Sequence, residues 1–280
     1  MTYRRGRVTA GAESQLTMPQ WRVGTIGFGY SDWEKVFYPD TIKSADHLAF
    51  YARHFDTIEL DTTFHAAPTP ERVSRWAAAV PDGFRFCVKT PKDVTHAAGP
   101  LSGRAAAMAG FLDAVRGFGA KLGVVLVQFP PGFDTSQARE LEKLLSGLPR
   151  DLRYAVELRH PSWRAGDSTK TLLIDHGCAW VAADYFDDPW EITVTADFLY
   201  VRWIGEHGRF PTLDRERVDV TERLAWWTRR IEESAAKVNT VWGLVNNDYS
   251  GYAVATANRV KGLVGLPVKE SDDPSQGELF

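Results

Sequence analysis

The chain has 280 residues, with 33 lysines and arginines against 36 aspartates and glutamates, and a formal net charge of −3. Hydrophobic residues make up 44% and charged residues 25%, which is ordinary globular composition and not that of a disordered chain. The near-neutral charge argues against a dedicated nonspecific nucleic-acid binder, because neutralising phosphates requires surplus basic residues. No apolar run approaches the roughly 20 residues that cross a bilayer.

The ends of the chain and its cysteines indicate a cytoplasmic protein. Arginines near the N-terminus are not followed by an apolar core, so a secretory signal is not expected. Cys87 and Cys178 lie in apolar runs and are too few for a disulfide framework, so we expect buried, reduced thiols. Residues 1–19 are expected to form a flexible extension, residues 20–268 one domain, and residues 269–280 a flexible tail.

Short apolar runs alternate with stretches at helical spacing along the central domain. The runs predict eight strands, at residues 22–28, 57–62, 84–90, 123–129, 153–159, 179–184, 198–204 and 240–246. The stretches between them predict helices at residues 45–54, 71–79, 103–118, 135–145, 168–176, 216–237 and 253–263. Between the sixth and seventh strands, Pro189 and a β-branched stretch leave no room for a full helix, so this crossover is expected to be irregular.

This alternation predicts an α/β fold, a single-domain (β/α)₈ barrel of the TIM type. A doubly wound open sheet is the main alternative. Its glycine-rich phosphate turn is incomplete here, because the first strand ends in Gly27-Phe28-Gly29-Tyr30 and lacks the third glycine. The sequence therefore contains no nucleotide-cofactor motif of this kind.

Side chains of a barrel strand alternate between the interior and the surrounding helices. Because Ile58 and Leu60 are expected to face the helices, Glu59 and Asp61 are predicted to face inward. The same alternation predicts inward polar side chains near the ends of later strands, namely Lys89, Gln128, Glu157, Arg159, Asp184, Arg202 and Asn246. Barrel enzymes place their active sites at this end of the strands, although a structural network of paired charges is the alternative.

The loops that follow the strands are rich in aromatic and polar residues. They predict a rim made by Tyr30, Trp33, Phe64, His96, His160, Trp163, Asn247 and Tyr249. Rigid stacking surfaces of this kind suit a planar or sugar-like ligand. For each aromatic residue considered alone, packing in the core is the alternative.

The same motifs resemble those of the YecE-like domain-of-unknown-function family 72. The resemblance spans about residues 21 to 265 and is carried, in order, by residues 24–30, 55–64, 84–91, 128–131, 156–163, 200–203 and 246–253. It implies a TIM-type barrel but no activity, because the family's reaction is not established. Two departures stand out: Phe28-Gly29-Tyr30 replaces the more usual Ser-Gly-Trp, and His65 replaces a tyrosine.

Three cations on one rim, Lys89, Arg159 and Arg202, predict an anionic ligand that carries a phosphate or a carboxylate. Glu59 and Glu157 are the candidates for proton transfer, and Lys89 is the third candidate catalytic residue. The leading hypothesis is therefore an enzyme, a hydrolase or an isomerase, that uses acid–base chemistry on a phosphate-bearing substrate such as a nucleotide or a nucleic acid.

A metal-dependent phosphoesterase or isomerase is a second hypothesis, based on architectural likeness to the xylose isomerase and apurinic endonuclease barrels. The candidate divalent-metal ligands are Glu59, Glu157, His160 and Asp184. The three rim cations would repel a metal, and no HxxH or HExxH spacing is present, so the sequence does not favour a metal.

The last five residues, Gln276-Gly277-Glu278-Leu279-Phe280, resemble the Gln-x-x-Leu-Phe peptide by which bacterial replication and repair proteins bind the sliding clamp. Gln276, Leu279 and Phe280 would make the contacts, at the end of an acidic tether. A tail whose last residues pack on the barrel is the alternative. The peptide suggests a third hypothesis, a non-catalytic anion-binding or nucleic-acid-binding adaptor tethered to the clamp.

Overall fold

The structure is a computed structural model, and it describes residues 19–97, 99, 101–186 and 192–269. Within these residues the strands form two parallel sheets, with the orders β1-β9-β8-β7 and β2-β3-β4-β5-β6. The strands are β1 (Gln20–Thr25), β2 (Thr57–Leu60), β3 (Arg85–Lys89), β4 (Leu122–Gln128), β5 (Arg153–Glu157), β6 (Ala179–Trp180), β7 (Ala182–Asp184), β8 (Phe198–Trp203) and β9 (Thr240–Val245).

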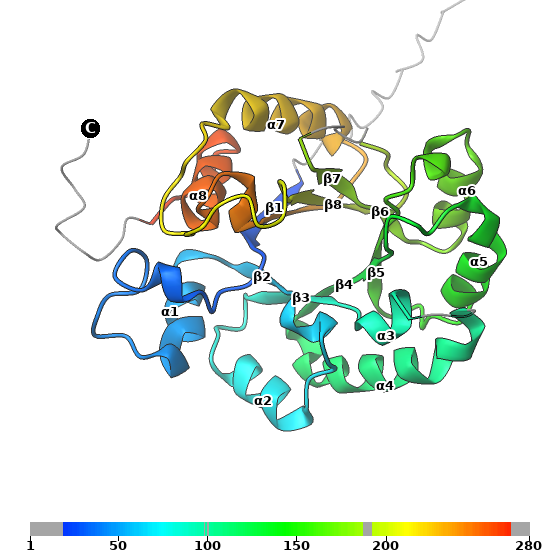
Figure 1. Ribbon diagram of the computed structural model, residues 1–280, viewed down its shortest axis with the longest axis horizontal. Helices are drawn as coiled ribbons and strands as arrows, with labels where there is room; N and C mark the ends of the chain where they lie inside the picture. Colours follow the sequence, from blue (N-terminus) through cyan, green and yellow to red (C-terminus); the bar gives the residue numbers. More distant parts are fainter. Residues whose placement is uncertain (1–18, 98, 100, 187–191, 270–280) are drawn as a thin grey trace, which may run out of the picture.

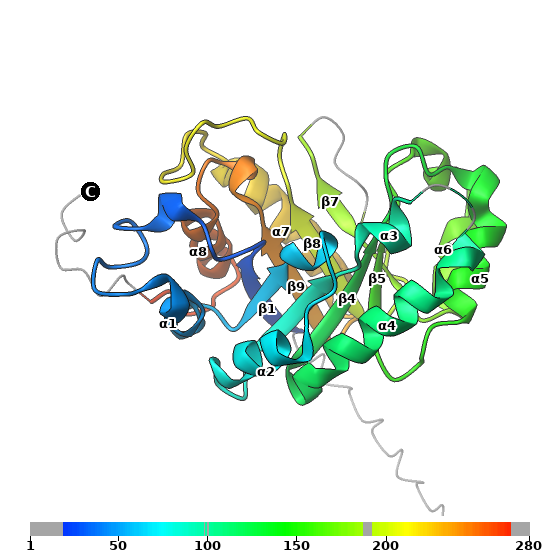
Figure 2. The same cartoon turned by 60° about the horizontal axis from the view of Figure 1, so that its bottom comes forward.

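Helices surround the strands in both overall views, with α2, α4 and α5 beside the β2–β6 sheet and α7 and α8 beside the other (Figures 1 and 2). They are α1 (His47–His54), α2 (Pro70–Ala78), α3 (Lys92–Thr95), α4 (Ala105–Val115), α5 (Ala138–Ser146), α6 (Ser168–Asp175), α7 (Thr221–Ala235) and α8 (Ala253–Leu263). The start of α2 is typical: Thr69 caps the helix by accepting from the backbone N–H of Arg72, and Pro70 occupies the first turn.

The parallel α/β organisation is confirmed, and each of the eight predicted runs forms strand. The sixth run divides into β6, which pairs with β5, and β7, which pairs with β8; between them Val181 still donates its N–H to the carbonyl of Val156 on β5. The short helix α3 was not predicted. The described part of the crossover from β7 to β8 contains no helix, and Pro189, on which the prediction of an irregular crossover depends, lies outside the described residues.

A closed TIM-type barrel is not confirmed, because the strands form two sheets instead of one. Between β1 and β2 the ladder is reduced to one isolated parallel bridge, from Ile26 to Glu59. The two strands nevertheless approach closely at Gly24, where an added Cβ would lie 2.1 Å from the carbonyl oxygen of Thr57. Only glycine permits this approach, which brings the two sheets together.

Two buried apolar layers hold the structure together. The larger one lies between strands and helices, and the smaller one includes Ile26, Cys87, Leu126, Tyr200 and Trp242. Cys87 and Cys178 are both free and buried, as predicted. Within the residues that the structure describes, no helix is long and apolar enough to traverse a bilayer.

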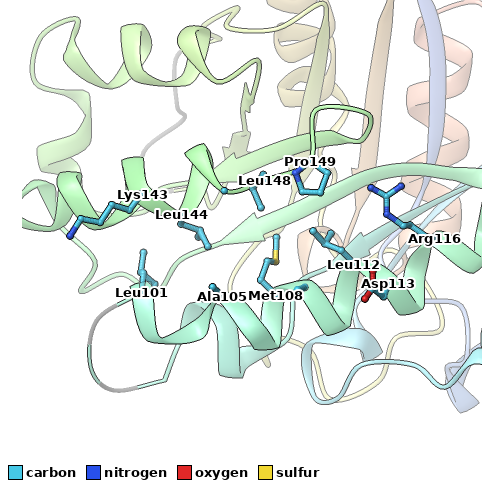
Figure 3. A pocket seen from close by; sticks show the side chains of 12 residues that line it. Leu101, Ala105, Met108, Leu112, Asp113, Arg116, Lys143, Leu144, Leu148 and Pro149 are labelled. Carbon is cyan, nitrogen blue, oxygen red and sulfur yellow. The ribbon is translucent and has the colours of Figure 1, made fainter.

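An apolar groove of about 380 Å³ lies between α4 and the end of α5 (Figure 3). Met108 and Leu112 of α4 face Leu144 and Leu148 across it. The groove is made by helices and by the loop before β5, so it is separate from the strand ends where the predicted site residues lie.

Candidate active site

A cavity of about 680 Å³ lies at the carboxyl end of the strands. Parallel strands end at the same edge, so residues far apart in the sequence meet there. Eight predicted site residues line the cavity: Asp61, Phe64, Lys89, His96, Gln128, Arg159, Arg202 and Asn246. The rest of the lining is Ile26, His65, Tyr185, Ile204, Gly205, Glu206 and His207.

Arg202 on β8 is held from both sides by buried carboxylates. Its Nε and Nη2 donate to the two oxygens of Glu59 at 3.0 and 2.7 Å, and its Nη1 donates to Glu157 at 2.5 Å and to Gln128 at 3.2 Å. The hydroxyl of Tyr200 also donates to Glu59, at 2.9 Å. Glu59 and Glu157 are 0% and 2% exposed, so neither carboxylate is free to meet a substrate.

Glu157 also fixes the next cation on the rim. Its second oxygen accepts from Nε of Arg159 at 2.8 Å and from the hydroxyl of Tyr185 at 2.5 Å. The Arg159 guanidinium lies over the Tyr185 ring, 4.9 Å from its centroid. Among the described residues the two Nη groups of Arg159 have no hydrogen-bond partner, so they remain available to a ligand in the cavity.

The charge state of Glu157 argues against its predicted role in proton transfer. Burial by itself would raise the pKa of this carboxyl, but Arg202 and Arg159 outweigh that effect and lower it to about 2. A group with this pKa stays ionised at neutral pH and cannot serve as an acid. Through their hydrogen bonds Glu59 positions Arg202, and Glu157 positions both Arg202 and Arg159.

The Glu157 carboxylate makes the stability of the fold depend on pH in the acidic range. Since its folded-state pKa lies below the ordinary value of 4.5, the ionised form stabilises the fold above that pH, and this stabilisation is lost as the pH falls toward 2. The contribution at neutral pH is about 3 kcal/mol. In urea unfolding between pH 7 and pH 2.5, the wild type should lose more stability than Glu157→Gln. Equal losses of stability in the wild type and in Glu157→Gln would contradict a lowered pKa for Glu157.

Lys89 and Asp61 are the titratable pair beside the two arginines. Burial, followed by the positive charge of Arg202, lowers the pKa of the Lys89 ammonium to about 8. Burial, followed by the negative charge of Glu59, raises the pKa of the Asp61 carboxyl. Both side chains line the cavity, and both are therefore able to gain or lose protons more readily than surface residues of their type.

His96 completes the titratable groups that were predicted for the rim. Its Nδ1 lies 2.8 Å from the hydroxyl of Thr95, and its ring meets Phe64 edge to face. Burial and then the positive charge of Lys89 lower the pKa of the imidazole to about 4, so it is neutral at physiological pH. Gln128 and Asn246 add neutral polar groups to the cavity wall.

Asp184 does not face the cavity, and its predicted inward orientation is wrong. Its carboxylate binds Arg223 through two hydrogen bonds of 2.7 and 2.6 Å, and it also accepts from Trp227 Nε1 and from the hydroxyl of Tyr249. These partners lie on the helix side of β7. The strand turns this way because Val181 and Ala183 occupy the inner layer.

Most of the predicted aromatic rim is core. Trp33 and Trp163 are 0% and 1% exposed, and their indole N–H groups donate to Asn247 and to the carbonyl of Phe133. Tyr30 packs against Trp33 and donates to the carbonyl of Ile26. Tyr249 is equally buried, so of the five predicted stacking aromatics only Phe64 lines the cavity.

His160 and Asn247 also lie outside the cavity lining. Nδ1 of His160 accepts from the backbone N–H of Ser162 at the start of a 3₁₀ turn. Asn247 is buried and accepts from the backbone N–H of Ala253. The four suggested metal ligands are thus not brought together, and across the described residues no three His, Cys, Asp or Glu side chains form a candidate metal site.

Sequence reasoning missed Tyr185, which stacks on Arg159 and binds Glu157. The alternation of inward and outward side chains along this strand predicts an inward Asp184; the opposite assignment of the two faces would have predicted an inward Tyr185. The sequence places Gly205 and His207 in the loop after the seventh strand, and both line the cavity, but it gave no sign that Ile204 and Glu206 beside them do so too. The clamp-like peptide at Gln276, Leu279 and Phe280 lies outside the described residues.

The sequence matches the model of a family described as "Protein of unknown function DUF72" over residues 22–278. It is 37% identical over 126 residues to the UPF0759 protein YecE of Escherichia coli K12, covering 45% of this chain and 46% of YecE. It is 29% identical over 147 residues to the UPF0759 protein YunF of Bacillus subtilis, covering 50% and 51% of the two chains. The matched part is thus about half the length of these curated relatives.

Solved structures give the same result over a larger part of the chain. A DUF72 family protein from Thermotoga maritima is 28% identical, with a TM-score of 0.74 over 88% of this chain and 99% of its own. A DUF72 family protein from Enterococcus faecalis, at 21% identity, shares the fold with a TM-score of 0.70 over 89% and 99% of the two chains. The chain therefore belongs to the DUF72 family of proteins of unknown function.

Proposed function

We propose that the protein is an enzyme that binds a small phosphate-bearing anion in the cavity and acts on it by acid–base chemistry. The observation that carries this proposal is the state of Arg159. Its Nε is fixed by Glu157, while its Nη groups have no partner among the described residues. Two parallel N–H donors on a fixed guanidinium match the oxygens of a phosphate or a carboxylate.

The charges around Arg159 support the same class of ligand. The negative charges of the two buried carboxylates are balanced by Arg202 and Arg159, so Lys89 leaves this group of five side chains with a net positive charge. No carboxylate of the described residues forms an ion pair with Lys89. An anion entering the cavity would therefore meet two cations that have charge or donors to spare.

Asp61 and Lys89 are the groups that we assign to proton transfer, in place of Glu59 and Glu157. Their pKa values are shifted toward neutrality by burial, whereas the pKa of Glu157 is shifted away from it. An acid–base catalyst works best when its pKa lies near the working pH. Hydrolysis and isomerisation of a phosphate ester both remain open to this pair.

The architecture proposed for this enzyme is still the TIM-type barrel. The Ile26–Glu59 bridge, the close approach at Gly24 and the continuous chain through Val181 support treating the two sheets as one eight-stranded layer. The position of the cavity at the carboxyl ends of the strands agrees with this arrangement. Neither alternative function gains a specific observation: the metal ligands lie apart, and the adaptor depends on the peptide outside the described residues.

Calorimetric titration with inorganic phosphate and with glucose 6-phosphate tests the anion site. Arg159→Gln is expected to weaken binding about tenfold to a hundredfold, because a charge-assisted bidentate contact contributes about 1.5–3 kcal/mol. Arg116→Gln is the matched control, since Arg116 is exposed and pairs with Asp151 on the helical layer. Phosphate binding that is unaffected by Arg159→Gln would refute the proposal. If the wild type binds phosphate, a second assay measures its turnover of phosphate esters: turnover indicates an enzyme, and binding without turnover indicates an adaptor.

A further inference from the structure

Lys89 has surroundings unlike those of a surface lysine. Its Nζ lies 3.9 Å from the centroid of the Phe64 ring, so one side of the amine is covered by an aromatic face. The strand register puts Asp61 next to it on one side, because Leu60 pairs with Val88. On the other side Lys89 pairs with Leu126, and Gln128 follows two residues later. The open side of the amine is the cavity.

We propose that Lys89 is a nucleophile that forms an imine with a phosphorylated aldehyde or ketone. This inference rests on the proposed function, because Arg159 would hold the phosphate group while the carbonyl carbon meets the lysine nitrogen. Only an unprotonated amine can attack a carbonyl, and a buried lysine beside another cation is the usual way in which proteins provide one. About a quarter of a group with a pKa near 8 is neutral at pH 7.5, against about one part in a thousand for an ordinary lysine.

The step balances without any oxidant or reductant. The lone pair of Nζ forms the N–C bond, and the carbonyl π pair moves to oxygen, which takes up a proton. The nitrogen then loses a proton, the hydroxyl group is protonated and leaves as water, and the C=N bond forms. Asp61 is placed to give and take these protons, since its carboxyl lines the same cavity and has a raised pKa. The protonated imine then withdraws electrons from the neighbouring carbon, which favours isomerisation.

Reductive trapping tests the inference on the full chain. The protein is incubated with dihydroxyacetone phosphate and sodium borohydride at pH 7.5, and labelled lysines are located by peptide mass spectrometry. Lys89 is expected to be labelled at least about tenfold faster than any other lysine, because its neutral fraction is larger. Lys89→Arg should abolish the dominant label, whereas Lys92→Arg, an exposed lysine three residues further on, should not. Unphosphorylated dihydroxyacetone, which has the same carbonyl group but no phosphate, serves as the control ligand.

The outcomes distinguish the imine at Lys89 from the proposed phosphate-binding function. Faster labelling with the phosphorylated ketone than with dihydroxyacetone supports both, and equal labelling of Lys89 by the two supports the imine alone. An unlabelled Lys89 in a protein that binds inorganic phosphate in calorimetry overturns the imine and leaves the proposed function standing. An unlabelled Lys89 without phosphate binding overturns both, and labels spread evenly over exposed lysines overturn the imine.

Discussion

Replacing Arg202 with methionine is expected to destabilise the protein by about 3–5 kcal/mol, because it leaves the buried Glu59 without a counter-charge and removes one of the two cations paired with Glu157. Glu59 and Glu157 would each lose hydrogen bonds from the guanidinium while remaining almost fully buried. The measurement is the free energy of unfolding from urea titration at pH 7. A loss of this size would be a large part of the total stability of a domain.

The control for this prediction is Arg116→Met. Arg116 also makes two hydrogen bonds to one carboxylate, that of Asp151, but both groups are exposed to solvent. Its removal should change stability little, because water takes over the exposed carboxylate. Adding Glu59→Gln and Glu157→Gln to Arg202→Met should recover part of the lost stability, since no charge is then buried alone. Equal losses of stability in Arg202→Met and Arg116→Met would show that the ion pairs of Arg202 with Glu59 and Glu157 contribute no more than an exposed pair, and would contradict the prediction.

Asp184→Ala is expected to be comparably severe, again about 3–5 kcal/mol, but without a comparable effect on the cavity. The substitution removes the buried acceptor for Arg223, Trp227 and Tyr249. All three lie on the helix side of the strand, whereas the groups that we propose to bind phosphate lie on the other side. Urea unfolding should show the loss, and calorimetry on the folded protein should show phosphate affinity within about threefold of wild type.

Asp82→Ala provides the comparison for this second substitution. Asp82 is exposed and pairs with Lys121 at 3.3 Å, so its removal should leave stability nearly unchanged. If Asp184→Ala instead abolished phosphate binding at full stability, Asp184 would belong to the site after all, and the structural assignment would be wrong.

The success of the sequence prediction depended on how strongly apolar the neighbours of each polar residue were. Glu59 lies between Ile58 and Leu60, so alternation leaves only one face for it, and the structure puts it inside. Asp184 follows Ala182 and Ala183, whose small side chains suit either face. The orientation there is decided by Arg223 and Trp227 on α7, which are distant in sequence, so strand parity alone could not give it.

The same limit applies to chemical roles. The sequence predicted acidic and basic groups at one edge, but it could not show which carboxylate oxygen meets which cation. Both oxygens of Glu157, which was predicted to be catalytic, accept hydrogen bonds from arginines. Asp61, which was predicted only as a binding residue, is the carboxyl whose pKa is raised. Likewise, Trp33 and Trp163 follow strands as ligand-stacking residues would, yet their N–H partners lie inside the fold.

The fixed position of Arg159 has a consequence for ligand capture. An arginine on a surface loses much of its rotational freedom when it grips an anion, at a cost of about 0.5–1.5 kcal/mol for an ordered side chain. Here Tyr185 and Glu157 hold the guanidinium plane in one orientation in advance. That entropy is lost during folding, so at the proposed site selectivity among anions would depend on how their oxygens are spaced and not on how far the protein can adapt.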